Sequence, residues 1–166
     1  ECENGFPNPQ DAAEPLLSIT MKNHQNKKIV VWGLHEFQNN RDDVDYRLCR
    51  DEDDLLIKFL NEWCMIYPDI ITGWNTEFFD IPYICNRINN LFGEEFMHKL
   101  SPWNNVFARE VYQMGRKHQV YAIQGVSALD FYDLYRKFTY TNQERYTLDH
   151  IAFVELGERK DGNPFE

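Results

Sequence analysis

A strand, a glycine turn and a helix follow one another between residues 69 and 93, and this order restricts the fold more than any other stretch of the chain. Ile70–Thr72 is short, apolar and β-branched, as a buried strand would be. After Gly73 and a polar turn, apolar residues recur at the spacing of one helical face. The members of this face are Ile81, Ile84, Cys85, Ile88, Leu91 and Phe92. Gly93 follows in the position where glycine ends many helices, so the pattern predicts a strand–turn–helix corner.

Asp80 precedes this apolar series directly, and its carboxylate admits two interpretations. It can be the N-cap of the helix, with Pro82 in the first turn, where proline is well tolerated. It can also be a carboxylate that rigid backbone holds where a metal ion or a phosphate group is bound. Taken alone, the strand–turn–helix corner favours the interpretation of Asp80 as the N-cap.

The wider pattern around Asp80 resembles a known family. Gly73-Trp74-Asn75-x-x-x-Phe79-Asp80 is similar to the second exonuclease motif of family-B DNA polymerases, in the form found in tailed phages related to the T-even group. Three further blocks resemble parts of the same 3′–5′ exonuclease (proofreading) domain and occur in the expected order. They are Gly5–Pro9, Gly125–Phe138 and Tyr146–Ala152. The resemblance therefore covers essentially the whole chain.

The fold that the resemblance implies is a mixed α/β domain of the ribonuclease-H-like type, in which helices flank a mixed sheet. The chain has 166 residues, of which 43% are hydrophobic, and this is the size of one domain with a substantial core. We expect residues 1–166 to be a single, partial exonuclease domain with a β-hairpin insertion, truncated at both ends. The other elements expected are strands at Leu16–Lys22, Lys27–Leu34 and Tyr46–Cys49, a hairpin of Val106–Tyr112 with Gln119–Ile123, and helices at Asp51–Tyr67, Leu129–Phe138 and Tyr146–Val154.

Charge and cysteine content restrict the partners that we expect. A net charge of −10 argues against this chain gripping duplex DNA tightly by itself. It is compatible with editing a DNA end that other domains deliver, because bound cations offset the charge of acidic ligands. The four cysteines lack paired metal-ligand spacing, so we expect a reducing cytoplasm, without disulfides or structural zinc. We expect no membrane partner, since no apolar run approaches the roughly 20 residues that cross a bilayer.

The resemblance implies a catalytic metal site built from carboxylates. Asp80 matches the second motif and would be a catalytic residue and metal ligand. Glu1 would be the glutamate of the first motif, also catalytic and metal-binding; Glu3 is a rival, and both can instead be loop charges. The aspartate that precedes this glutamate in the family and the later Tyr-x-x-x-Asp motif are absent from the chain. We therefore expect the two-metal Mg²⁺ (or Mn²⁺) site only in the complete parent protein, and the isolated chain to be inactive.

The resemblance also implies contacts to DNA. Phe6 would stack on unpaired bases, or else pack its own loop, and Asn75 would contact the terminal nucleotide, or else cap the turn. Phe79 belongs to the same motif, and the hairpin tip with Met114 and Arg116 would help to separate primer from template. Asp130 belongs to a block that is chiefly structural in the family, so we do not expect it to bind metal.

The function that follows is part of a DNA-directed DNA polymerase, viral in origin, whose exonuclease domain removes mismatched 3′-terminal nucleotides. The partners would be the single-stranded 3′ end of the primer, the polymerase domains of the same parent chain and a sliding clamp, in the cytoplasm of a host cell. Two alternatives remain open: an exonuclease-like scaffold or DNA-positioning module that has lost its chemistry, and a free-standing ribonuclease-H-like nuclease. The second needs a complete carboxylate set without polymerase domains.

Overall fold

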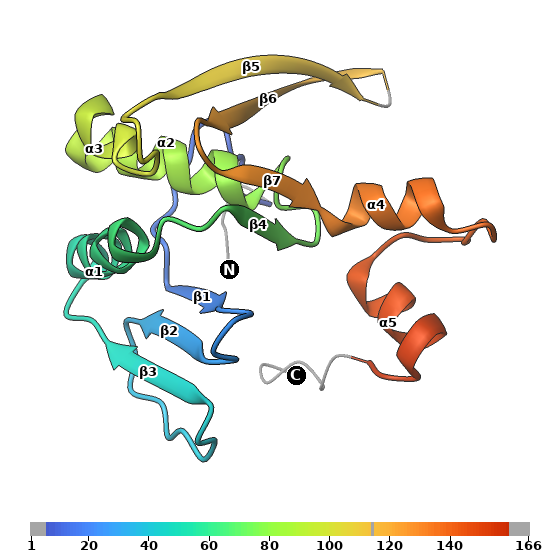
Figure 1. The fold of residues 1–166 in the computed structure, drawn as a ribbon, viewed down its shortest axis with the longest axis horizontal. Helices are drawn as coiled ribbons and strands as arrows, with labels where there is room; N and C mark the ends of the chain where they lie inside the picture. Colours follow the sequence, from blue (N-terminus) through green and yellow to red (C-terminus); the bar gives the residue numbers. More distant parts are fainter. Residues whose placement is uncertain (1–5, 114, 160–166) are drawn as a thin grey trace.

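A computed structural model of the protein describes residues 6–113 and 115–159. The N-terminal part is a three-stranded sheet in the order β1–β2–β3 (Figure 1). Strands β1 (Ser18–Lys22) and β2 (Ile29–Gly33) pair antiparallel, and β3 (Val44–Leu48) lies parallel to β2. Side chains of Asn23 and Asn26 accept hydrogen bonds from backbone N–H groups two residues further on, and these bonds form the turn between β1 and β2. The predicted strands are confirmed, each with slightly different ends.

Helix α1 (Glu52–Ile66), which the sequence predicts at Asp51–Tyr67, covers this sheet with an apolar face. Its buried residues are Leu55, Leu56, Phe59, Leu60 and Trp63. The helix begins after Asp51, whose side chain accepts a hydrogen bond from the Asp54 N–H at 2.8 Å. It ends at Tyr67, which has a φ of 37°. Pro68 follows and cannot continue a helix.

The predicted strand–turn–helix corner is present in the centre of the molecule. Strand β4 (Ile70–Gly73) leads through a loop into helix α2 (Asp80–Phe92), which ends at Gly93 with a φ of 88°. The partner of β4 is β7 (Ser127–Asp130), which lies parallel to it in a separate two-stranded sheet. The sequence placed residues 129 and 130 in a helix, and this was wrong, because they continue the pairing with β4.

A long β-hairpin packs above α2 (Figure 1). Strands β5 (Val106–Gln113) and β6 (Arg116–Ile123) pair antiparallel and form a sheet of their own. The predicted hairpin is confirmed, and both of its strands extend further toward the turn than the sequence indicates. A short helix, α3 (Glu94–His98), precedes it and was not predicted.

Two short helices form the C-terminal part of the described chain. Helix α4 (Phe131–Phe138) follows β7 directly, and α5 (Leu148–Leu156) lies beyond it at one end of the molecule, away from the hairpin (Figure 1). Each starts two residues later than the sequence indicates. No helix in the described ranges combines the length and the apolar character that crossing a membrane requires.

The main core lies between the first sheet, α1 and α2. It contains the buried residues Ile19, Val30, Trp32, Leu55, Leu56, Phe59, Leu60, Trp63, Cys85, Ile88, Met97, Leu100 and Val106. Trp63 fixes α1 to the region after α3, because its indole N–H donates a hydrogen bond of 2.7 Å to the carbonyl of Leu100. The ring of Trp32 meets that of Phe59 edge-on, with centroids 5.6 Å apart.

A groove separates β1 from β4. Neither the β1 edge opposite β2 nor the β4 edge opposite β7 is paired with another described strand. The groove has a volume of about 570 Å³, and residues of both strands line it together with apolar side chains of α1 and α2. An unpaired strand edge presents backbone donors and acceptors with which an extended segment can pair.

Candidate functional site

The loop between β4 and α2 carries the motif residues of the sequence. A Cβ atom at Gly73 would clash with the Thr76 Cγ2 atom, so a larger residue here would require the Thr76 side chain to move. Asn75 has a φ of 62°, in the left-handed region that asparagine tolerates better than most residues. Its carbonyl accepts a hydrogen bond from the Phe79 N–H at 3.2 Å, and the Thr76 carbonyl accepts one from the Ile81 N–H at 2.9 Å. The loop is therefore a tight turn that leads into the helix at Asp80.

Asp80 is the first residue of α2. The N-cap position belongs to Phe79, without a side-chain hydrogen bond at this helix start, so the interpretation of Asp80 as the cap was wrong. The residue is exposed, and it lies at the polar end of the groove between β1 and β4, with Thr72 and Thr76. Desolvation by the surrounding protein raises the pKa of the Asp80 carboxyl above its usual range, and the negative charge of Asp130 raises it further. A carboxylate in these surroundings is one that a bound cation would stabilise.

A second hollow, of about 700 Å³, lies on the other side of this corner and brings together three of the predicted residues: Phe6, Asn75 and Phe79. The rings of Phe6 and Phe79 lie with centroids 5.1 Å apart and tilted by 45°. Phe6 is 84% exposed, so packing against Phe79 leaves most of its ring open to a ligand. Asn75 is also exposed, and its side chain does not cap the loop, whose bond to Phe79 uses the backbone carbonyl. The hollow thus combines aromatic faces with the exposed amide of Asn75, which suits a flat heterocyclic ligand.

Residues of the hairpin and of α4 complete the wall of this aromatic hollow. His118 and Gln119 come from β6, and Tyr132 comes from α4. The His118 ring meets the Phe78 ring edge-on at 5.3 Å. On β5, Arg109 donates a hydrogen bond of 2.9 Å to Glu77, which joins the hairpin to the loop.

Polar residues of α2 hold the N-terminal segment that brings Phe6 to the site. The side-chain amides of Asn86 and Asn90 donate hydrogen bonds to the carbonyls of Pro9 and Asp11, at 2.8 and 3.0 Å. The Tyr83 hydroxyl donates a further one, of 2.7 Å, to the Glu14 carbonyl. Sequence reasoning missed these residues, because it considered only the apolar face of α2.

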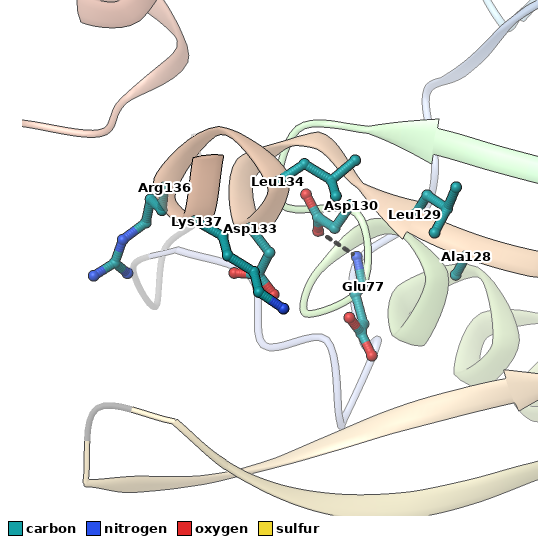
Figure 2. Close-up of a pocket in the computed structure, with 8 residues that line it drawn as sticks. All are labelled: Glu77, Ala128, Leu129, Asp130, Asp133, Leu134, Arg136 and Lys137. Atoms are coloured by element: carbon teal, nitrogen blue, oxygen red, sulfur yellow. Dashed lines mark hydrogen bonds between the residues drawn. The ribbon is translucent and has the colours of Figure 1, made fainter. Parts of the chain in front are cut away.

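Asp130 was expected to be chiefly structural, but its contacts with the loop were not predicted. It is 5% exposed and lies beneath the loop, where its carboxylate accepts hydrogen bonds from loop N–H groups. It also borders a third hollow, of about 600 Å³, which is lined by Glu77, Ala128, Leu129, Asp133, Leu134, Arg136 and Lys137 (Figure 2). The prediction that Asp130 does not bind metal stays a prediction. A buried carboxylate still needs hydrogen-bond donors, and the loop supplies them.

The remaining predicted site residues come from the N-terminus of the chain and from the hairpin tip. Glu1, its rival Glu3, and Met114 lie outside the described residues. Arg116 is the first residue of β6, at the far end of the hairpin from its base at Val106. Among the described residues, no group of three or more His, Cys, Asp or Glu side chains could hold a metal ion. The metal-binding role of Asp80 therefore stays a prediction for the described part of the chain.

Comparison with known proteins connects these hollows to a family. The family described as DNA polymerase family B, exonuclease domain, matches residues 1–151. A DNA-directed DNA polymerase of Escherichia phage RB69 is 34% identical over 182 aligned positions, which cover 95% of this chain and 20% of that protein. The DNA-directed DNA polymerase of Enterobacteria phage T4 is 40% identical over 119 positions, or 72% of this chain and 13% of its own length. The DNA polymerase delta catalytic subunit of Candida albicans is 31% identical over 118 positions, which cover 66% of this chain and 11% of the subunit. The chain thus spans about a fifth or less of the length of these relatives.

Proposed function

Because the chain belongs to the exonuclease domain of family B DNA polymerases, we propose that it removes unpaired nucleotides from the 3′ end of a primer, as part of a longer DNA polymerase. The observation that carries the proposal is the placement of Asp80 directly after Phe79, between the groove and the aromatic hollow. A terminal base in the hollow would leave its phosphodiester near the first turn of α2.

The aromatic hollow fits the single-stranded 3′ end of a DNA primer. The open face of Phe6 can stack on a base of any sequence, and stacking of this kind contributes about 1–3 kcal/mol per base. Asn75 would contact the terminal nucleotide through its exposed amide. Removal of mismatched nucleotides requires this tolerance, since the wrong base can be any of the four.

The metal ions of the proposed reaction need more carboxylates than the described residues supply. Mg²⁺ prefers oxygen ligands in a strict octahedron, and Asp80 can provide one side of such a site. When bound, a pair of divalent cations activates water and stabilises the charge that develops at phosphorus. The further ligands would come from Glu1 and from parts of the longer polymerase. The contribution of the described chain is to bind the DNA end and to place one ligand beside it.

The groove between β1 and β4 supports this arrangement. Both unpaired strand edges face it, and Asp80 lies along it. We assign the groove to an extended segment of the same polymerase chain that carries the Asp-x-Glu pair of the first motif. Pairing there would join the two sheets and bring its carboxylates toward Asp80.

The test is made on the full-length polymerase that contains this domain. Asp80→Asn should lower the Mg²⁺-dependent release of 3′ nucleotides from single-stranded DNA by about a hundredfold or more, because metal ligation contributes several kcal/mol to such reactions. Primer extension should be unchanged. Asp43→Asn is the matched control, since it removes an equal charge from an exposed ion pair with Arg41. Full exonuclease activity of the Asp80 variant would overturn the proposal.

A further inference from the structure

Asp130 lies next to the loop between β4 and α2, where its carboxylate contacts the loop backbone. It is the last residue of β7, and in the parallel pairing it stands opposite Gly73, where the loop begins. It is also the N-cap of α4, since its Oδ1 atom accepts a hydrogen bond of 2.9 Å from the Tyr132 N–H. The sheet register and the helix start therefore fix the position of this side chain from two sides.

The same carboxylate binds the loop at two points. Oδ1 also accepts a hydrogen bond from the Asn75 N–H, and Oδ2 accepts one from the Glu77 N–H, each at 2.9 Å. Figure 2 shows the Asp130 carboxylate turned toward the Glu77 nitrogen, while the Glu77 side chain points away from it. Because that side chain pairs with Arg109 of β5, the loop is held both by β7 and by the hairpin.

The bond to Asn75 has a specific consequence for the backbone. Asn75 is in the left-handed region, which is costly for residues other than glycine and persists where the surroundings enforce it. A partly buried hydrogen bond from its own N–H to a carboxylate helps to hold this conformation. In this conformation the exposed Asn75 side chain lines the aromatic hollow.

We propose that Asp130 is a positioning residue, which holds the loop so that Asn75 and Asp80 face the DNA end; this rests on the function proposed above. Only a carboxylate fits the task among side chains of this size. It accepts hydrogen bonds at both oxygens, whereas an asparagine in its place accepts at one and donates at the other. Asp130 acts through the loop and does not contact the substrate.

The test is backbone amide hydrogen exchange, followed by NMR in the chain of residues 1–166. In Asp130→Asn, the remaining oxygen should stay at the Oδ1 position, where it accepts two bonds, so that the Glu77 amide exchanges about tenfold faster and the Asn75 amide keeps its protection. In Asp130→Ala, both amides should exchange at least about tenfold faster. Thr147→Ala is the control, because it removes an N-cap hydrogen bond from α5 and should leave both amides unchanged.

A purely structural role for Asp130 gives a different pattern. If Asp130 only supported the fold as a whole, its substitution would speed exchange equally in the loop and in the core amides of α1. Equal acceleration at Asn75 and Glu77 in Asp130→Asn is the other contrary result. Either result would overturn the proposal. Selective loss of exchange protection at the Glu77 amide in Asp130→Asn would support the proposal. The exchange pattern requires no exonuclease activity, so failure of this inference is distinguishable from failure of the proposed function.

Discussion

The two long helices begin with a carboxylate as their first residue, Glu52 in α1 and Asp80 in α2, but the two side chains have opposite surroundings. Glu52 is nearly buried and forms a two-pronged ion pair with Arg87, at 2.6 and 2.7 Å. It also accepts a hydrogen bond of 2.7 Å from the Leu16 N–H. Asp80 is exposed, at a helix start without a side-chain cap.

The pKa values of carboxyl groups at the two helix starts shift in opposite directions. Asp54, in the first turn of α1, has its pKa lowered to about 2, chiefly by the hydrogen bond from Lys58 and then by the one from the Arg50 N–H. Desolvation raises the pKa of Asp80. The fold therefore favours the ionised form of Asp54 in α1 and disfavours the ionised form of Asp80 in α2. We infer that the start of α1 serves stability, and we propose that the start of α2 gives up some stability because Asp80 has a ligand-binding role.

Removal of the Glu52 side chain should give the largest effect. Glu52→Ala leaves the guanidinium of Arg87 without its partner at a site where both side chains are about one-eighth exposed, and breaking such a pair costs about 3 kcal/mol. The free energy of unfolding, measured by urea denaturation, should fall by that amount. Asp43→Ala breaks the exposed pair with Arg41, which solvent screens, and should cost much less than Glu52→Ala. Equal losses in the two variants would remove the basis for assigning a structural role to the start of α1.

Asp54→Asn should give a smaller effect that depends on pH. Because the folded-state pKa of Asp54 lies below the ordinary value of 3.8, its contribution to stability is complete above that value and is lost as the pH falls toward about 2. The variant should therefore be less stable than the parent chain at neutral pH, and the difference should close between pH 3.8 and about 2. Urea denaturation over this range measures the difference, with Asp53→Asn in the same turn as the control for charge. A difference that does not change with pH would contradict this account of Asp54.

The sequence predicted the elements whose apolar residues repeat over several turns. Helix α1 was expected at Asp51–Tyr67 and is observed at Glu52–Ile66, and the end of α2 at Gly93 was also predicted. Helix α3 has five residues and β7 has four, which is too short for either period to be recognised. The start of α4 was misplaced because β7 was not recognised before it. The pairing that defines β7 joins it to β4, more than 50 positions earlier in the chain.

The resemblance named Phe6, Asn75 and Phe79 as DNA contacts, and all three line one hollow, although their roles stay predictions. Sequence reasoning missed the residues that join distant segments through polar contacts. The amides of α2 that hold the chain near Pro9, and the bonds of Asp130 to the loop, follow no sequence period. Such contacts depend on the folded positions of both partners.

Asp80→Asn tests the central contrast most directly, although the expected change is the smallest. A carboxyl group whose folded-state pKa is raised opposes folding when ionised, and this cost is absent below its unfolded-state pKa. The account predicts that the variant is slightly more stable than the parent chain at neutral pH, and that the gain disappears as the pH falls below the ordinary range of aspartate. The measurement is the free energy of unfolding across that pH range, beside Asp54→Asn, for which the opposite sign is expected. A loss of stability at neutral pH in Asp80→Asn would show that the carboxylate supports the helix, and would contradict the account.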